Sequence, residues 1–425
     1  MLLHSVDLAL TRRCNLRCAF CYIEEKTSET PAGEVERNIK TVDWIVAQYR
    51  AGMDDIAPEH RRIGLSLYGG EPTVAWDSVL ALNEYKKTCD IPIQLSLVTN
   101  MVLMDESRID FCMAHRIGIH PSIDGCQEAE DFFRRTEKGV PVSDTVFRNA
   151  KVLTSKMKGR SCRSTIAPET AQWMLKSLKF LCEDIGFETV NQVLAGGVNW
   201  TDEALEVVRQ QTVEITDWWI DCLRKGVHYS LYYMRNMLTG IWNPMRDRRL
   251  CSSGLSRAAI DTDGNIYPCH RFCNASTPAE YKMGNIHEGG VVNMELENNL
   301  KGFDVAAFHK DKCSTCIAVN SCHALCLHEM MLQGKGMFEP LDHYCKLWPF
   351  YYREAMRAHA MLTAEQNQKY LQIYRPRPRA QNLQRGRRNG QRPAPGFEPA
   401  WEGFEVSSVT AAQWVPDCGP PRRRK

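Results

Sequence analysis

Short apolar runs alternate with helical patterns along the first 245 residues of the chain. Runs typical of β-strands cover residues 5–10, 62–68, 93–99, 117–123, 161–166 and 188–194. Helical patterns between them cover residues 34–50, 77–88, 105–115, 143–158 and 170–185. This alternation predicts a parallel sheet flanked by helices. Repeated in this way, it predicts an α/β fold of the partial (β/α)6, TIM-like barrel type, whose functional loops lie at the C-terminal ends of the strands.

A helical stretch at 201–226, followed by another at 228–240, is rich in aromatic residues. Its large rings are those of Trp218, Trp219, Tyr229, Tyr232 and Tyr233. Aromatic residues at helical spacing are more often part of a core than of a binding site. We therefore expect core packing here, and a wall of a substrate pocket is the alternative.

The composition changes after the barrel pattern ends. The next part is rich in cysteine, contains a hairpin turn at Asp263-Gly264-Asn265, and ends in a helical pattern at 348–362. From about residue 375 the chain is rich in arginine, proline and glycine, which predicts disorder because such a segment cannot bury a core. We therefore predict a barrel domain at 1–245, a cysteine-rich domain with a closing helix at 246–362, and a disordered basic tail at 363–425.

The bulk composition narrows the class of protein. The 425 residues include 44% hydrophobic residues and carry a formal net charge of +2, as expected for a globular protein. No run of about 18 apolar residues occurs, so we expect no membrane span. The N-terminus, Met1-Leu2-Leu3-His4, has no signal-peptide pattern, which predicts a cytoplasmic protein, or one of the host cytoplasm if phage-encoded. In a reducing compartment, 18 cysteines favour metal or cluster ligation over disulfides.

Three closely spaced cysteines, Cys14, Cys18 and Cys21, directly follow the first predicted strand. Three thiolates can hold three corners of a 4Fe–4S cluster and leave one iron without a protein ligand. The alternative is a zinc knuckle, although zinc prefers four ligands and paired spacings. The position after a strand places these cysteines at the functional end of the barrel.

The second predicted strand ends in Tyr68-Gly69-Gly70-Glu71-Pro72. The two glycines would let a ligand approach the backbone closely, and Glu71 could accept a hydrogen bond from an ammonium group. Together with the three cysteines, this motif resembles the signature of the radical S-adenosylmethionine (radical SAM) superfamily. The resemblance implies that the open iron chelates the methionine part of SAM, whose amino group binds at Gly69, Gly70 and Glu71. It also assigns Phe20 as the aromatic residue expected before the third cysteine.

Two later strand ends fit the same resemblance. Thr99 and Asn100 match a cofactor-binding stretch of the family, although Met101 replaces its glycine, and Ser122 and Asp124 match a serine–aspartate loop. Asp124 could instead be a turn residue before a glycine. The resemblance further assigns Arg134 to the carboxylate of the cofactor. Arg135 is an equal candidate by its chemistry.

A second set of cysteines has a spacing of its own. The pattern C-x12-G-x4-C, C-x2-C-x5-C-x3-C and a final C is formed by Cys251, Cys269, Cys313, Cys316, Cys322, Cys326 and Cys345. It resembles the SPASM domain, which holds two auxiliary 4Fe–4S clusters. The resemblance assigns one cluster to Cys313, Cys316, Cys322 and Cys345, and the other to Cys251, Cys269 and Cys326. Zinc bound at the two closely spaced pairs is the alternative.

The second auxiliary cluster has only three ligands in this assignment. Cys273 could be the fourth, and without it an iron would stay open for a substrate. The residue after Cys269 is His270, where sulfatase maturases of this family place an aspartate base. This difference disfavours sulfatase maturation. We expect His270 to act as a proton acceptor or as a hydrogen-bond donor to cluster sulfur.

The resemblance implies reductive cleavage of SAM to a 5′-deoxyadenosyl radical, with an external one-electron reductant of the flavodoxin or ferredoxin type. The expected substrate is an aminoacyl group of a peptide, which is oxidised, cross-linked or rearranged. The alternative is an isomerase that acts on an aminoacyl-modified base, such as glycyl-thymidine, in phage DNA. It is motivated by the basic tail, which could contact DNA, and by the absence of a peptide-recognition segment before the barrel. A non-enzymatic iron–sulfur or zinc protein is disfavoured, because electron transfer does not require the Gly69-Gly70-Glu71 motif.

Overall fold

Parallel strands form the centre of the structure, a computed structural model. It describes residues 4–54, 56–157, 159–242, 253–255, 257–302, 310–322, 326–334 and 339–374. Four strands lie in the order of the chain in one sheet: β1 (Ser5–Thr11), β2 (Ile63–Gly69), β3 (Ile93–Thr99) and β4 (Gly118–Pro121). A second sheet contains β5 (Ser161–Ile166), β6 (Thr189–Leu194) and β7 (Ser230–Leu231). A parallel bridge between Ser122 and Arg163 connects the sheets at β4 and β5.

All six predicted strands are present, and neighbouring strands pair in parallel. The apolar side chains align across the sheet, as where Val6 pairs with Leu65 and Leu65 with Leu95. The side chains of these three residues are fully buried. The predicted partial barrel of the α/β class is therefore confirmed.

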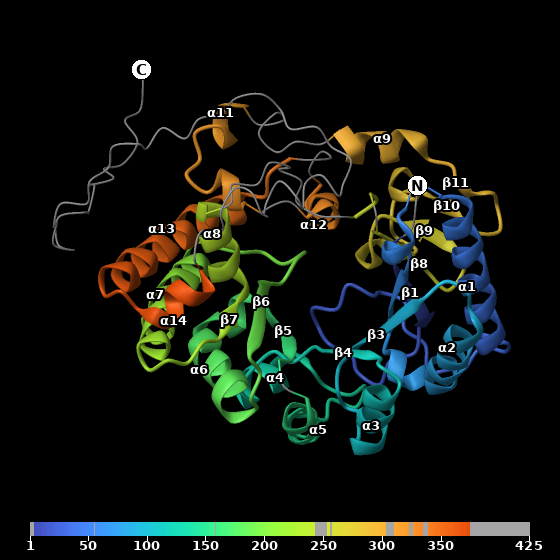
Figure 1. The fold of residues 1–425 in the computed structure, drawn as a ribbon, viewed down its shortest axis with the longest axis horizontal. Coiled ribbons are helices and arrows are strands. Elements are labelled where there is room, and N and C mark those ends of the chain that lie inside the picture. The colour runs from blue at the N-terminus through green and yellow to red at the C-terminus, as the bar shows by residue number, and fades with distance from the viewer. Residues whose placement is uncertain are drawn as a thin grey trace. The chain divides into compact units, whose positions relative to one another are not determined.

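Helices cover the outside of the strands (Figure 1). Those that match predicted patterns are α1 (Glu34–Ala51), α2 (Trp76–Thr88), α3 (Glu106–Ala114), α5 (Ser143–Lys156) and α7 (Asp202–Arg224). The single helix predicted at 170–185 is instead a 3-10 turn, a short α-helix and a π turn: η3 (Pro168–Trp173), α6 (Met174–Lys179) and η4 (Phe180–Asp184). Short elements that the pattern did not predict include η1 (Pro58–His60), η2 (Pro72–Ala75) and α4 (Gln127–Phe133).

The cysteine-rich part continues the barrel sheet. Its first strand, β8 (Arg257–Ile260), pairs in parallel with the free edge of β1. The predicted hairpin turn is present, because β9 (Asn265–Tyr267) returns antiparallel to β8. The sheet ends with β10 (Gly284–Asn285) and β11 (Gly290–Val291). The described residues fall into one compact unit, within which the boundary near residue 245 stays a prediction.

The remaining helices follow this sheet extension. They are η5 (His270–Phe272), η6 (Ala279–Tyr281), α9 (Met294–Gly302), α11 (Lys310–Cys313), η7 (Val319–Ser321), α12 (Leu327–Leu332), α13 (Asp342–Ala364) and α14 (Gln368–Ile373). The long helix α13, which contains the predicted helix at 348–362, packs against α7 and α8 (Tyr232–Trp242) (Figure 1). Among the described helices, none is both long and apolar enough to cross a membrane. The tail predicted to be disordered at 363–425 starts too early, because residues 363–374 form the end of α13 and α14, where Tyr370 is fully buried. The rest of the predicted tail, from 375 onward, lies outside the described residues.

The aromatic residues of α7 and α8 divide between core and cavity. Trp219 is fully buried, and its indole Nε1 donates a hydrogen bond of 2.8 Å to the carbonyl oxygen of Tyr229. Trp218 is only partly buried and stacks on the Tyr229 ring at a centroid distance of 5.4 Å. Tyr232 and Tyr233 instead line a cavity that is described below. The expected core packing thus holds for Trp219, whereas Tyr232 and Tyr233 form part of a pocket wall, which was the alternative.

The turn after β2 packs directly on the turn after β1. The Gly70 N–H donates to the Thr11 carbonyl oxygen at 2.9 Å, and the Glu71 N–H donates to the Arg13 carbonyl oxygen at 2.8 Å. A Cβ atom on Gly69 would lie 2.3 Å from the Thr11 carbonyl oxygen, and one on Gly70 would lie 2.2 Å from that of Arg13. Within the chain, both glycines are therefore required by backbone contact with the segment that leads into Cys14.

Replacement of Trp219 with alanine should lower the free energy of unfolding by about 3–5 kcal/mol, because it leaves a large cavity and an unpaired Tyr229 carbonyl group. Urea denaturation followed by far-UV circular dichroism measures the effect. The matched control is Trp218→Ala on the same helix, for which we expect a clearly smaller loss. Equal losses in the two variants would contradict the assignment of Trp219 to the core.

Replacement of Gly70 with alanine should displace the segment that precedes Cys14, because the new Cβ atom would collide with backbone rather than with a movable side chain. We expect reconstituted protein to lose about one third of its bound iron, which is one of three predicted clusters. Iron and sulfide analysis measures this loss. Gly64→Ala in β2 is the control, since the nearest atom to its Cβ atom would be 3.6 Å away. Full iron content in Gly70→Ala would refute the prediction.

Candidate active site

The three cysteines after β1 line one cavity at the C-terminal ends of the strands. Cys14, Cys18 and Cys21 are partly buried in the walls of this cavity, which has a volume of about 180 Å³. The structure brings most of the predicted cofactor-binding residues to the same cavity. They are Phe20, Gly69, Gly70, Glu71, Thr99, Asn100, Ser122 and Arg134. We name this space the cysteine cavity.

The donor set of the cysteine cavity fits an iron–sulfur cluster better than a zinc ion. Among the described residues, no three His, Cys, Asp or Glu side chains converge on one point as a single ion requires. A 4Fe–4S cluster instead gives each cysteine its own iron, so that the sulfurs stay apart. The Leu16 N–H donates to the Cys14 sulfur at 3.4 Å. The buried Nδ2 of Asn15 has no hydrogen-bond partner in the described part of the chain and could donate to cluster sulfur.

Burial dominates the electrostatics of two of these thiols. It raises the pKa of Cys14 to about 11 and the pKa of Cys18 to about 12. Both groups are therefore neutral thiols at physiological pH unless a metal binds. Because the thiolate is the ligand form, cluster binding must displace protons from these sites.

The carboxylate of Glu71 holds the loops around the cysteine cavity together. Its Oε2 accepts a hydrogen bond of 2.7 Å from the Asn100 N–H, and its Oε1 accepts two from Thr73. The side-chain amide of Asn100 in turn donates to Oδ1 of Asn15 at 2.9 Å. Burial raises the pKa of Glu71, and these donors act in the opposite direction. Glu71 thus connects the turn after β2 to the end of β3 and, through Asn100, to the cysteine loop.

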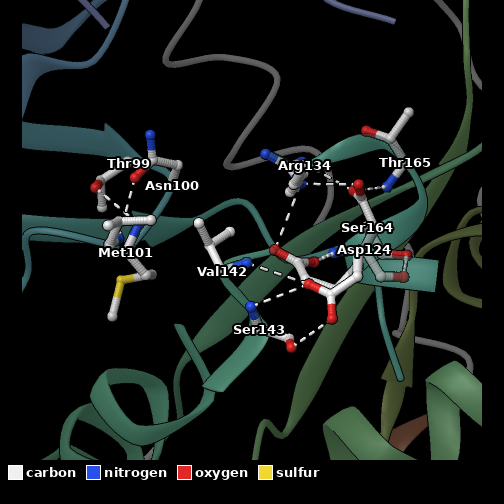
Figure 2. A network of polar contacts seen from close by, with 12 residues as sticks. Thr99, Asn100, Met101, Asp124, Arg134, Val142, Ser143, Ser164 and Thr165 are labelled. Atoms are coloured by element: carbon white, nitrogen blue, oxygen red, sulfur yellow. Dashed lines mark hydrogen bonds and ion pairs between the residues drawn. The ribbon is translucent and has the colours of Figure 1, made fainter. Parts of the chain in front are cut away.

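Arg134 and Asp124 form a buried ion pair beside the cysteine cavity (Figure 2). Nε and Nη2 of Arg134 donate to the two carboxylate oxygens of Asp124 at 2.8 and 2.9 Å. The guanidinium also lies over the Phe20 ring, 5.3 Å from its centroid. Asp124 itself does not line the cavity, so a direct cofactor contact for it has no support in this geometry. Arg135 is exposed and binds the Gly139 carbonyl oxygen, so that of the two candidates only Arg134 lines the cysteine cavity.

A second carboxylate, Glu130, lies within 3.7 Å of the Arg134 guanidinium and is fully buried. Its Oε2 accepts a hydrogen bond from the Asp124 N–H at 2.6 Å. Burial raises the pKa of Glu130 above its ordinary value, although the Arg134 charge opposes this change. Arg134 keeps its charge, because Asp124 and Glu130 outweigh the effect of burial and raise its pKa.

A larger cavity of about 460 Å³ adjoins the cysteine cavity. The two share four wall residues: Arg163, His270, Arg271 and His328. Two predicted ligands of an auxiliary cluster, Cys269 and Cys326, line the larger cavity, and Cys251 lies outside the described residues. Aromatic side chains form much of the remaining wall, namely Tyr232, Tyr233, Tyr344, Trp348 and Tyr351.

Cys273 does not line either of the two cavities. Cys273 is partly buried, and its sulfur accepts a hydrogen bond of 2.9 Å from the Tyr68 hydroxyl group. Burial raises the pKa of Cys273 well above the ordinary value. Its assignment as a fourth ligand of the auxiliary cluster stays a prediction.

The four cysteines predicted to bind the other auxiliary cluster are partly buried. A backbone turn joins the first two, in which the Cys316 N–H donates to the Cys313 carbonyl oxygen at 3.2 Å. Burial raises the pKa of Cys313, and the neighbouring Cys345 and Cys316 add to the effect. The fourth of these cysteines, Cys322, directly follows η7. Their role as cluster ligands stays a prediction.

His270 is oriented by a carboxylate that the sequence patterns did not single out. Its Nδ1 lies 2.8 Å from Oδ2 of Asp7, a buried residue of β1 that Arg257 of β8 also binds. Burial lowers the pKa of His270 despite Asp7, so the ring is neutral and Nδ1–H donates to the carboxylate. Nε2 is then left as a hydrogen-bond acceptor. The rings of Tyr22 and Tyr68 pack against the imidazole at centroid distances of 5.6 and 5.4 Å.

Asp7 was missed because its partners are remote in the chain, and Arg163 was missed because the two cavities that it lines form only in the folded protein. A signal was nevertheless present: Asp7 interrupts the apolar run of β1, and Arg163 interrupts β5. A charged side chain in the middle of a buried strand is unfavourable unless an opposite charge, a hydrogen-bond partner or a ligand binds it.

Comparisons with known proteins agree with this geometry. The profile of the radical SAM superfamily matches residues 8–181, and that of SPASM, an iron–sulfur cluster-binding domain, matches residues 251–317. A cysteine-type anaerobic sulfatase-maturating enzyme of Clostridium perfringens is 20% identical over 80% of this chain and 93% of its own. The radical SAM cyclopropyl synthase TigE of Paramaledivibacter caminithermalis is 17% identical over 76% of this chain and 67% of its own.

Solved structures share the fold. The structure of native anSMEcpe with bound AdoMet has a TM-score of 0.66 at 19% identity and covers 85% of this chain and 99% of its own. SuiB of Streptococcus suis, bound to the precursor peptide SuiA, has a TM-score of 0.53 at 15% identity, with 81% and 76% covered. The two domain matches imply 4Fe–4S clusters and SAM as the cofactors. With the cysteine spacing and the cavity geometry, the matches show that the chain belongs to the radical SAM superfamily and carries a SPASM domain.

Proposed function

We propose that this enzyme abstracts a hydrogen atom from an aminoacyl group of a peptide, which is then oxidised, cross-linked or rearranged. The observation that carries the proposal is the contact between the two cavities. The cysteine cavity is lined by the residues predicted to bind the cluster and SAM, and the larger cavity shares four wall residues with it. A substrate group in the larger cavity would therefore lie next to the cofactor. A volume of about 460 Å³ lies in the range typical of small-ligand sites and suits one or two side chains.

Two relatives have been seen with peptides. SuiB is bound to its precursor peptide, and anSMEcpe has been solved with AdoMet and a peptide together. Their likeness to this chain shows the fold, and their peptides support a substrate of the same class for it. The aromatic wall of the larger cavity is consistent with this class, because aromatic rings bind apolar side chains over a large area.

When bound, the cluster and SAM supply a 5′-deoxyadenosyl radical that takes a hydrogen atom from an unactivated carbon. The chain contributes alignment and the exclusion of water. Glu71 and Asn100 fix the loops around the cysteine cavity, and Arg134 offers its remaining N–H groups to a carboxylate there. Because Asp124 holds the guanidinium by two hydrogen bonds, Arg134 needs little reorganisation to bind.

His270 is placed to accept a proton that the substrate loses on oxidation. It lines both cavities, and its Nε2 is an acceptor because Nδ1–H donates to Asp7. In this proposal Asp7 is a positioning residue, which fixes the tautomer and the direction of the ring. The absence of an aspartate at position 270 separates this site from the sulfatase maturase pattern.

The isomerase that acts on an aminoacyl-modified base in DNA is the second candidate. The observation that favours it is the arginine-rich segment from residue 375, which lies outside the described residues. Seven arginines and no acidic residue between 375 and 397 could hold a phosphate backbone. The same two cavities would serve this reaction, with the aminoacyl group of the base in the larger one.

Asp7→Asn should uncouple substrate conversion from SAM cleavage. The amide can donate to Nδ1, which moves the ring proton to Nε2 and removes the acceptor. We expect the ratio of modified product to released 5′-deoxyadenosine to fall by at least about tenfold, within the range of general-base effects. Liquid chromatography with mass spectrometry measures both compounds. A proportional fall in both would indicate a merely structural role and contradict the proposal.

Anaerobically reconstituted enzyme with dithionite and SAM should release 5′-deoxyadenosine, and a deuterated peptide substrate should transfer deuterium into it. The test uses peptides encoded by short neighbouring reading frames, with glycyl-thymidine DNA in parallel. Replacement of Cys14, Cys18 and Cys21 by alanine should abolish the reaction, whereas Cys89→Ala, outside both cavities, should not. Deuterium transfer from the DNA alone would favour the second candidate. No 5′-deoxyadenosine, and about one zinc per chain, would reject both.

A further inference from the structure

The walls of the larger cavity carry an excess of positive charge. Arg163, Arg257 and Arg271 line it, and among the described residues Asp7 is the one carboxylate in its wall. That carboxylate is already bound, since Arg257 and His270 both contact it. The cavity therefore has guanidinium groups that its own acidic residues do not neutralise.

Arg271 has a partner within the site. Its Nη1 lies 3.8 Å from the sulfur of Cys326, one of the predicted cluster ligands. Although burial alone would lower it, the pKa of Arg271 is raised by nearby groups, of which Cys326 is the foremost. A bound cluster with its thiolates would account for this cation.

Arg163 makes no side-chain hydrogen bond or ion pair with the described residues, although Tyr22, Tyr344 and Cys326 oppose the lowering of its pKa. It lies on β5, and its backbone is fixed because its carbonyl oxygen accepts the Ile123 N–H at 2.9 Å. Its side chain keeps exposed surface and lines both cavities. No carboxylate of the described residues forms an ion pair with its guanidinium, in contrast to Arg134, which has Asp124 and Glu130.

The electrostatics of Arg163 agree with this difference. Burial and the charge of Arg271 lower the pKa of Arg163, whereas the two carboxylates raise that of Arg134. Because Arg163 keeps exposed surface, water solvates its charge in the free protein, and no carboxylate of the described residues neutralises it. A ligand that displaces this water and supplies an anion would pair with the guanidinium directly.

We infer that Arg163 binds a carboxylate of the substrate at the boundary between the two cavities. This inference rests on the proposed function, in which the substrate is a peptide whose anionic groups are carboxylates. The planar guanidinium can hold a carboxylate by two parallel hydrogen bonds. Because Arg163 also lines the cysteine cavity, a carbon close to that carboxylate would be held next to the cofactor. The enzyme would thus select an acidic side chain or a C-terminal residue.

The test measures binding of small probes to reconstituted enzyme with SAM by ligand-observed NMR. N-acetylglutamate α-amide carries a side-chain carboxylate, and N-acetylglycine carries a main-chain one. N-acetylglutamine α-amide and N-acetylglycinamide are their neutral counterparts. We expect saturable binding of at least one carboxylate probe, weakened by at least about tenfold in Arg163→Met and less in Arg163→Lys. Arg148→Met, which removes an exposed arginine of α5, is the matched control and should bind as the wild type.

The carboxylate probe that binds identifies the source of the group. Equal binding of the acidic and neutral probes, or an unchanged affinity in Arg163→Met, would overturn the inference. If inorganic phosphate displaced the carboxylate probe at lower concentration, the site would be one for phosphate, and the inference would also fail. Loss of SAM together with the probe in both Arg163 variants would place Arg163 on the cofactor instead. A carboxylate site without any peptide turnover would keep this inference and reject the proposed function.

Discussion

The backbone contact between the turn after β2 and the turn after β1 is the constraint on which the site depends. Two peptide groups of the Gly69-Gly70-Glu71 turn donate to carbonyl oxygens of the segment that enters the cysteine loop. No side chain fits between them, because a Cβ atom on either glycine would overlap the backbone. Hydrogen bonds continue from this contact: the Glu71 carboxylate accepts one from Asn100, and the Asn100 side chain donates one to Asn15 beside Cys14. A shift at one turn would therefore displace the other turn, the end of β3 and the cysteine loop together.

A second connection joins the barrel to the cysteine-rich part. β8 extends the sheet at β1, and the Asp7 carboxylate of β1 binds Arg257 of β8 and His270. Burial alone would raise the pKa of Asp7, but these two partners outweigh it and lower the pKa. The carboxylate is thus ionised, and both of its oxygens bind these partners. One residue therefore fixes both the position of the second part and the orientation of an imidazole between the two cavities.

Local pattern predicted the strands, the hairpin and the cysteine loop, since each depends on neighbours in the chain. The sequence could not show why Met101 replaces a glycine; its φ of 66° lies in the left-handed region, so the turn keeps the backbone that the glycine would have. Asp124 was assigned to the cofactor but binds Arg134. Asp7 escaped detection because His270 lies 263 positions away, and such pairings form only when the sheet closes.

Two arginines that line the cysteine cavity, Arg134 and Arg163, differ in burial and in their counter-ions. Arg134 is buried and is neutralised by Asp124 and Glu130, so that its remaining donors are held in place before any ligand binds. Arg163 keeps exposed surface and forms no ion pair with a carboxylate of the described residues, so water solvates its charge in the free protein. In the proposed role of Arg163, a permanent counter-ion there would compete with the carboxylate of the substrate. Without one, the free energy of binding depends on the anion that the ligand itself supplies, which favours selection among substrates.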